Sequence, residues 1–245
     1  MRGKTHCAVG IITGIQLSLI FSQPIIPTTI VSSAVFSTLP DLDKSNSIIS
    51  GIILKKNFSK FLYKLILFFL DIAIFLVSIK ISSSFFISAF ITFFTIIFLE
   101  KKITHYNMRK ALITGTLFLL SIILFLAKVN LSFIIPFIIF SIFPWLRHRN
   151  FSHSFFMVII VYLIMKPISI LIDYEFLAFL SSFMYLLHII CDMFTRQGVA
   201  IFYPFSKNMI SLGYIKVGGK FSNIIENLII LILFIVTIHL MLKFL

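Results

Sequence analysis

Long apolar runs set the strongest limit on what this chain can fold into. They lie at about 61–79, 82–99, 112–127, 131–146, 154–172, 176–194 and 223–242. A helix needs about 20 apolar residues to cross a bilayer, and it pairs its own backbone polar groups there. The chain is 60% hydrophobic, more than a soluble domain usually is. The sequence therefore predicts an all-α, polytopic membrane helical bundle, with about seven spans in a single domain over residues 1–245.

The first apolar segment, residues 7–38, differs from the others because polar residues and prolines interrupt it. Gln16, Gln23, Pro24 and Pro27 all fall inside it. A proline in a helix interior removes a backbone donor and clashes with the preceding turn. We expect two short helices that form a hairpin or re-entrant pair here. One kinked span is the alternative.

The distribution of positive charge predicts an orientation. With the hairpin, residues 1–6, 39–60, 100–111, 147–153 and 195–222 share one side of the membrane. Apart from Lys80, Lys128, Lys166 and Lys243, all of the 21 Lys and Arg residues lie on or beside these segments. The positive-inside rule makes that side cytoplasmic. The net charge of +13 is therefore explained by flanking residues, and no nucleic-acid partner is expected.

Five polar features fall on this same side. They are Thr5-His6, the PDLD of residues 40–43, the HRNFSHS of residues 148–154, the HIICD of residues 188–192, and the segment with Thr195 and Gly198. The spans were drawn from apolar length and not from these motifs. Their shared side therefore predicts one common site near the membrane surface.

The spacing within the motifs indicates how their side chains could converge. His188 and Asp192 are four residues apart, so a helix places both on one face. His148 and His153 are five residues apart, so they can converge only if a turn separates them. Carboxylates together with imidazoles suit Zn²⁺, Mn²⁺ or Fe²⁺ better than Ca²⁺ or Mg²⁺. The predicted metal ligands are His6, Asp41, His148, His153, His188 and Asp192.

Each feature alone has a simpler interpretation. A single histidine near an interface is more often a surface residue, PDLD could be a turn or a helix cap, and HRNFSHS could be a basic loop. Glu226 could reach the cluster or favour a helix N-terminus. Cys7 and Cys191 could be soft ligands, although thiols in apolar helices are common. Asp71, inside a span, is a possible proton-relay or helix-packing residue. The shared side of the polar motifs favours a metal site over these separate interpretations.

At these motifs the chain resembles the YdjM-like family of predicted membrane-bound metal-dependent hydrolases. The resemblance consists of TH, PDLD, HRNFSHS and HIICDMFTRQGVAIFYPF in that order, from residue 5 to about 205. Ser152 stands where the family pattern has threonine, which keeps the hydroxyl. The order of ligands also resembles that of zinc-dependent phospholipase C, although further ligands of those soluble enzymes lack clear counterparts. The resemblance implies a hydrolase whose ligands are His6, Asp41, His148 or His153, His188 and Asp192.

We therefore predict a membrane-bound metal-dependent hydrolase at the cytoplasmic membrane surface. One or two divalent ions, most simply Zn²⁺, would lower the pKa of a water molecule and polarise the scissile group. Asp43 or Asp41 would accept a proton, and Arg149 would contact a phosphate oxygen. Membrane lipids would be the environment and the substrate class, as a phospholipid or another lipid-like phosphoester or ester. The sequence leaves the oligomeric state open.

Two other classes of protein remain possible at this point. A transporter would also gather polar residues, although usually near the bilayer midplane in broken helices. Asp71 and the proline-broken first segment favour that class. A structural or regulatory membrane protein could instead use a metal only to hold its fold together.

Overall fold

The chain folds into helices connected by turns and 3-10 segments. The computed structural model describes residues 1–244 and, among them, every side chain except those of residues 99–102 and 220. The α-helices are α1 (Gly3–Ile20), α2 (Pro27–Phe36), α3 (Ile48–Ile53), α4 (Lys56–Ser82), α5 (Phe85–Lys102), α6 (His105–Leu126), α7 (Leu131–Ser141), α8 (Phe155–Leu171), α9 (Phe176–Met193) and α10 (Lys220–Phe244). The 3-10 helices are η1 (Leu39–Asp43), η2 (Phe143–Trp145) and η3 (Phe151–His153).

The predicted helical membrane bundle is confirmed, and every predicted span coincides with a helix. Four helices are long and apolar enough to cross a membrane: α4, α6, α9 and α10. The helices at the other three predicted spans, α5, α7 and α8, are apolar but shorter over their described residues. Helix α7 ends before the predicted boundary at 146, because the chain passes into the 3-10 turn η2 around Pro144.

The broken first segment is the predicted hairpin, formed by α1 and α2. Helix α1 ends at Ile20, Ser22 adopts a φ of 51°, and Pro27 occupies the first turn of α2. Proline fits a first helical turn because that turn needs no intrahelical donor. The two helices pack closely: a Cβ on Gly10 would lie 2.2 Å from the Ser37 Oγ and 2.9 Å from the Ser33 carbonyl oxygen.

This close packing predicts that Gly10→Ala destabilises the hairpin. One of the atoms that the new methyl group meets belongs to the backbone, so the helices must move apart. We expect a loss of about 1–3 kcal/mol in the free energy of unfolding. Unfolding by denaturant in detergent, followed by circular dichroism, measures it. Gly115→Ala in α6 is the matched control, because no heavy atom lies within 4 Å of its Cβ position; an equal loss in both variants would contradict the packing argument.

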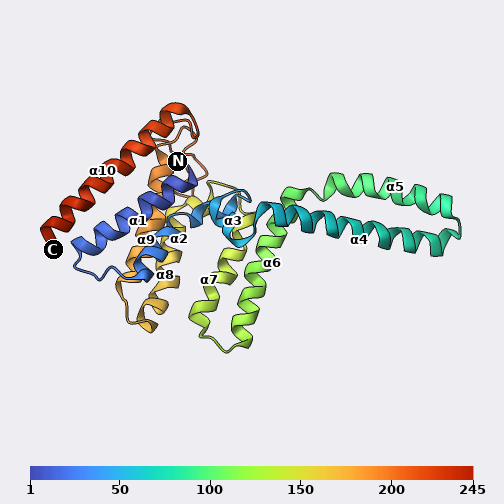
Figure 1. Cartoon of the computed structure of the whole chain (residues 1–245), viewed down its shortest axis with the longest axis horizontal. Helices are drawn as coiled ribbons and strands as arrows, with labels where there is room; N and C mark the ends of the chain where they lie inside the picture. Colours follow the sequence, from blue (N-terminus) through green and yellow to red (C-terminus); the bar gives the residue numbers. More distant parts are fainter. Residues whose placement is uncertain (245) are drawn as a thin grey trace.

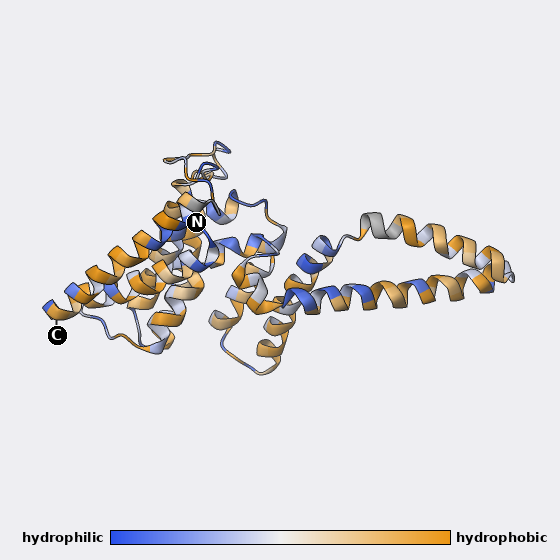
Figure 2. Cartoon of the chain, turned by 45° about the horizontal axis from the view of Figure 1, so that its top comes forward, coloured by the Kyte–Doolittle hydropathy of each residue, from blue (hydrophilic) through white to orange (hydrophobic). Residues whose placement is uncertain are grey.

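The arrangement of the helices brings three polar segments to one end of the molecule. Helix α9 packs against α8, α2 and α1, and α10 packs against α1 (Figure 1). The connections 37–47, 142–154 and 194–219 lie at the end opposite the α6–α7 and α8–α9 turns, while the α4–α5 hairpin extends away from the body (Figure 1). The helices are mostly hydrophobic along their length, and hydrophilic residues gather in the connections and at the first turns of α4 and α6 (Figure 2).

Arg109 in α6 joins three segments at this end. Its side chain is buried, at 2% exposed. The guanidinium donates to the carbonyl oxygen of Ser45 at 2.5 Å, to that of Leu54 at 2.8 Å, and to the Ser59 Oγ at 3.1 Å. These contacts fix the chain around α3 and the start of α4 against α6.

Polar side chains attach the last helix, α10, to the first. The buried carboxylate of Glu226 accepts hydrogen bonds from the Thr5 Oγ1 and from the Arg2 Nε at 2.9 Å. Further along, the Gln16 Nε2 donates to the Leu233 carbonyl oxygen at 2.8 Å and to the Thr237 Oγ1 at 3.0 Å. Glu226 thus fixes the residue next to His6.

Candidate metal centre

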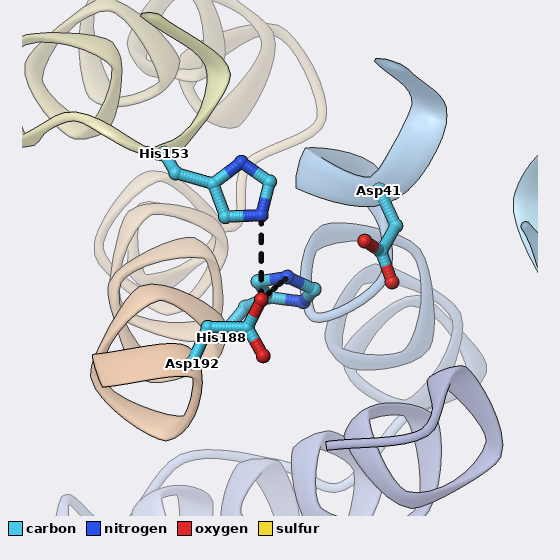
Figure 3. Close-up of side chains that lie close together, drawn as sticks. All are labelled: Asp41, His153, His188 and Asp192. Atoms are coloured by element: carbon cyan, nitrogen blue, oxygen red, sulfur yellow. Dashed lines mark ion pairs between the residues drawn. The ribbon is translucent and has the colours of Figure 1, made fainter. Parts of the chain in front are cut away.

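Four residues from three separate segments of the sequence form one buried group. A ligand atom from each of Asp41, His153, His188 and Asp192 lies within 4.8 Å of the others, and all four side chains are buried. Asp41 comes from η1, His153 from η3, and His188 and Asp192 from α9. The side chains face one another across a small central space (Figure 3). Two imidazoles and two carboxylates suit Zn²⁺, Mn²⁺ or Fe²⁺.

Asp192 is the centre of this group. Its Oδ2 lies 3.7 Å from the His153 Nε2 and 3.9 Å from the His188 Nε2, as the dashed lines in Figure 3 mark. The same oxygen lies 3.3 Å from an Arg149 nitrogen. Its Oδ1 lies 3.3 Å from the His6 Nε2. One carboxylate therefore faces three imidazoles and one guanidinium.

The hydrogen bonds of His188 and His153 determine which nitrogen faces the group. The His188 Nδ1 lies 2.7 Å from the carbonyl oxygen of Ser37, which can only accept, so this nitrogen carries the proton. The His153 Nδ1 lies 3.0 Å from the Ser152 Oγ, whose own hydrogen goes to Asp43. In both rings the Nε2 lone pair therefore points toward Asp192. A partner on the other ring nitrogen is the usual way in which proteins orient a metal-binding histidine.

Burial keeps the His153 ring neutral. It lowers the pKa of His153 to about 4, although the carboxylates of Asp43 and Asp192 act to raise it. At neutral pH the Nε2 lone pair is therefore available. The Nε2 atoms of His6, His153 and His188 are all buried without a hydrogen-bond partner. Three such atoms around one carboxylate fit a bound cation, because buried polar atoms are otherwise almost always paired.

His6 lies at the edge of the four-residue group. Its ring stacks on that of His188, with centroids 3.9 Å apart and planes inclined by 20°. His6 is 2% exposed, and its Nε2 faces the Asp192 Oδ1. The positively charged amino group of Met1 lies 3.0 Å from the same oxygen. His6 therefore adjoins the group without sharing its compact arrangement.

His148 and Asp43 form a second group with His153. The His148 Nδ1 lies 2.8 Å from the Asp43 Oδ1, and the Asp43 Oδ2 accepts a hydrogen bond from Ser152. The turn that the five-residue spacing requires is present: Arg149 between the two histidines has a φ of 66°, and the two imidazole centroids lie 5.0 Å apart. Both oxygens of Asp43 are occupied by donors, whereas His148 keeps a quarter of its side chain exposed.

Arg149 points inward and is buried, at 4% exposed. One terminal nitrogen donates to the Thr195 Oγ1 at 2.8 Å and to the Gly198 carbonyl oxygen at 2.9 Å, and the other faces Asp192. Gly198 has a φ of 63°, and a Cβ there would lie 2.4 Å from the Ile210 carbonyl oxygen. Glycine is needed at this close turn.

Other candidates lie outside the two groups. Among the described residues, Cys7 and Cys191 are free thiols that belong to neither group. Glu226 reaches Thr5 and not the metal ligands. Asp71 lies on the α4–α5 hairpin, in a groove lined mostly by aromatic and aliphatic side chains. The sequence did not indicate Tyr185, whose buried hydroxyl donates to the Ser152 carbonyl oxygen; its position three residues before His188 was the available signal.

Comparison with known proteins identifies the family. Searches of curated proteins and of solved structures each found no significant match. The predicted likeness to zinc-dependent phospholipase C therefore stays a prediction. The model of one family, described as YdjM inner membrane protein, matches residues 1–244. The chain belongs to the YdjM inner membrane protein family.

Proposed function

We propose that this protein is a metal-dependent hydrolase that acts on a phosphoester or ester of a membrane lipid at the cytoplasmic membrane surface. The observation that carries the proposal is the set of three buried imidazole nitrogens without partners around the Asp192 carboxylate. Leaving such atoms desolvated and unpaired is costly. Functional sites are where proteins accept that cost, and a divalent cation would supply the missing partner.

Asp41, His153, His188 and Asp192 would hold one ion, with His6 beside them. When bound, the ion would polarise the scissile group and lower the pKa of a water molecule. A single ion fits better than two, because the second group uses both oxygens of Asp43 for hydrogen bonds. To hold a second ion together with Asp43 and His148, His153 would also have to bind one ion through each of its two ring nitrogens. The donor set fits Zn²⁺ first, and Mn²⁺ or Fe²⁺ next.

His148 is the best placed residue to move a proton. Asp43 accepts a hydrogen bond from its Nδ1–H, so the Nε2 would be the nitrogen that accepts or returns a proton. That atom accepts a hydrogen bond from the Arg149 Nε at 3.3 Å, which it would have to release first. This assigns Asp43 a positioning role, where the sequence predicted a proton acceptor. Arg149 fixes the Asp192 carboxylate and the connection that follows α9. Its contact with a substrate phosphate stays a prediction.

The location of the site at the ends of the helices supports an enzyme over a transporter. The ligands come from η1, η3 and the last turns of α9, and not from the middle of broken helices. The same end carries most of the Lys and Arg residues, which supports its placement on the cytoplasmic side.

The test is hydrolysis of phospholipid vesicles by the purified full-length protein, with its metal content measured by mass spectrometry. We expect about one equivalent of metal and release of product that stops when a chelator removes the metal. His148→Gln should keep the metal and lower kcat by at least about tenfold.

Three outcomes would contradict the proposal. Hydrolysis that survives chelation would show that the metal group is not the active site. Metal-dependent ion flux without hydrolysis would make the protein a transporter. Bound metal with neither hydrolysis nor flux would leave the structural role, in which the ion holds the fold together.

A further inference from the structure

A pocket lies in the connection between α9 and α10, next to the metal group. Main-chain hydrogen bonds hold this connection in a fixed shape. The Arg196 backbone nitrogen donates to the Ile215 carbonyl oxygen at 3.1 Å, and Val199 and Ile210 pair with each other at 3.0 and 2.9 Å. The main chain of the connection is therefore held by its own hydrogen bonds, although it contains no α-helix.

The lining of the pocket is basic. The pocket is partly open to its surroundings and has a volume of about 430 Å³. Its lining consists of Thr195, Arg196, Gln197, Ile215, Lys216 and Val217. The lining includes an arginine, a lysine and a glutamine, and none of the six residues is acidic. Guanidinium and ammonium groups that share one concave site suit a phosphate group.

The pocket connects to the metal group through Thr195. The Thr195 Oγ1 accepts a hydrogen bond from Arg149, whose other terminal nitrogen lies 3.3 Å from Asp192. A narrow crevice shares Thr195, Ile215 and Val217 with the pocket, and also touches Cys191, the residue next to Asp192. A molecule whose phosphate occupies the pocket would therefore have its adjoining bonds near the metal ligands.

The same connection carries exposed aromatic side chains. Tyr214 is 94% exposed and Phe205 is 89% exposed. Tyr214 is two residues before Lys216, a residue of the pocket lining. Aromatic residues mixed with lysines are typical of protein segments that lie at the headgroup level of a membrane. Anionic lipids at that level attract basic residues.

We propose that the pocket between Arg196 and Lys216 binds the phosphate of an anionic lipid headgroup and presents that lipid to the metal group. The proposal rests on the proposed function, because it names the subsite through which that substrate class would be recognised. The lipid is favoured over free phosphate because the exposed ring of Tyr214, the residue before Ile215 of the lining, gives its acyl chains an adjacent aromatic surface.

Binding of short-chain lipids to the full-length protein in neutral nanodiscs tests this inference. The probes are dihexanoyl phosphatidic acid, inorganic phosphate and dihexanoylglycerol, each titrated in the presence of a chelator so that no metal can contribute. The double variant R196Q/K216Q should weaken phosphatidic acid binding by at least about tenfold, or about 1.4 kcal/mol. Lys207→Gln is the matched control: it removes an exposed lysine of the same connection that does not line the pocket, and should change binding by less than about twofold. The other two probes should bind wild-type protein at least about tenfold more weakly than phosphatidic acid.

Each alternative result would overturn the inference. Unchanged binding in R196Q/K216Q would show that the pocket is not the site, and an equal loss in Lys207→Gln would indicate general surface charge. Inorganic phosphate that binds as tightly as phosphatidic acid would indicate a free-phosphate site. Because binding is measured without metal, selective lipid binding together with an absence of hydrolysis would refute the proposed function and leave this subsite standing.

Discussion

Under the proposed function, replacing His188 with alanine should abolish metal binding by the protein. His188 contributes one of the two imidazoles of the four-residue group, and its other ring nitrogen is already fixed by the Ser37 carbonyl oxygen. Partners that only orient a ligand change metal affinity by about 10–100-fold. Loss of the ligand itself should therefore cost at least about a hundredfold. Mass spectrometry of the purified protein, dialysed against a weak chelator, gives the metal-to-protein ratio.

The matched control for this prediction is His239→Ala. His239 is an exposed histidine on α10, so its variant should keep the wild-type ratio. Asp192→Asn should lose metal as His188→Ala does, because Asp192 is the carboxylate that all three imidazoles face. If both site variants keep full metal content while their helical circular dichroism is unchanged, the metal centre is not where we place it.

Arg109→Met should strongly destabilise the protein. Methionine can fill the space of the stem, but the carbonyl oxygens of Ser45 and Leu54 and the Ser59 hydroxyl lose their charged donor. Buried acceptors left without a partner cost roughly 1–3 kcal/mol each. The free energy of unfolding should therefore fall by more than about 3 kcal/mol, as measured by denaturant unfolding in detergent micelles.

Lys60→Met provides the comparison for Arg109→Met. Lys60 is an exposed cation on α4, and its replacement removes the same charge without leaving a buried group unpaired. Its effect should stay below about 1 kcal/mol. Comparable losses in the two variants would mean that net charge, and not the buried hydrogen bonds of Arg109, determines stability at this end of the bundle.

The general architecture could be predicted from the sequence because apolar length is a direct requirement of the bilayer. The hairpin followed from Pro24 and Pro27 for a similarly local reason. The convergence of HRNFSHS with HIICD could be predicted too, because the helix ends on one side of a membrane all lie in the same thin layer at its surface. These inferences needed only chain length, helical period and charge.

The roles within the site could not be predicted in this way. Asp41 and Asp43 lie two residues apart in PDLD, and only the path of η1 sends one toward His188 and the other toward His148. The importance of Arg109 was also hidden, because nothing in KKITHYNMRK distinguishes a buried arginine from a solvated one. Side-chain direction and burial depend on distant segments, which local patterns do not encode.

The contact between Glu226 and Thr5 has a consequence for how the protein is made. A ribosome releases the first helix into the membrane long before the last one has been synthesised. Until α10 is inserted, Thr5 and Arg2 lack the Glu226 carboxylate that accepts their hydrogen bonds. The backbone next to His6 is therefore not yet held in place. The nascent chain can therefore fix His6 beside the four-residue group only after α10 has entered the membrane.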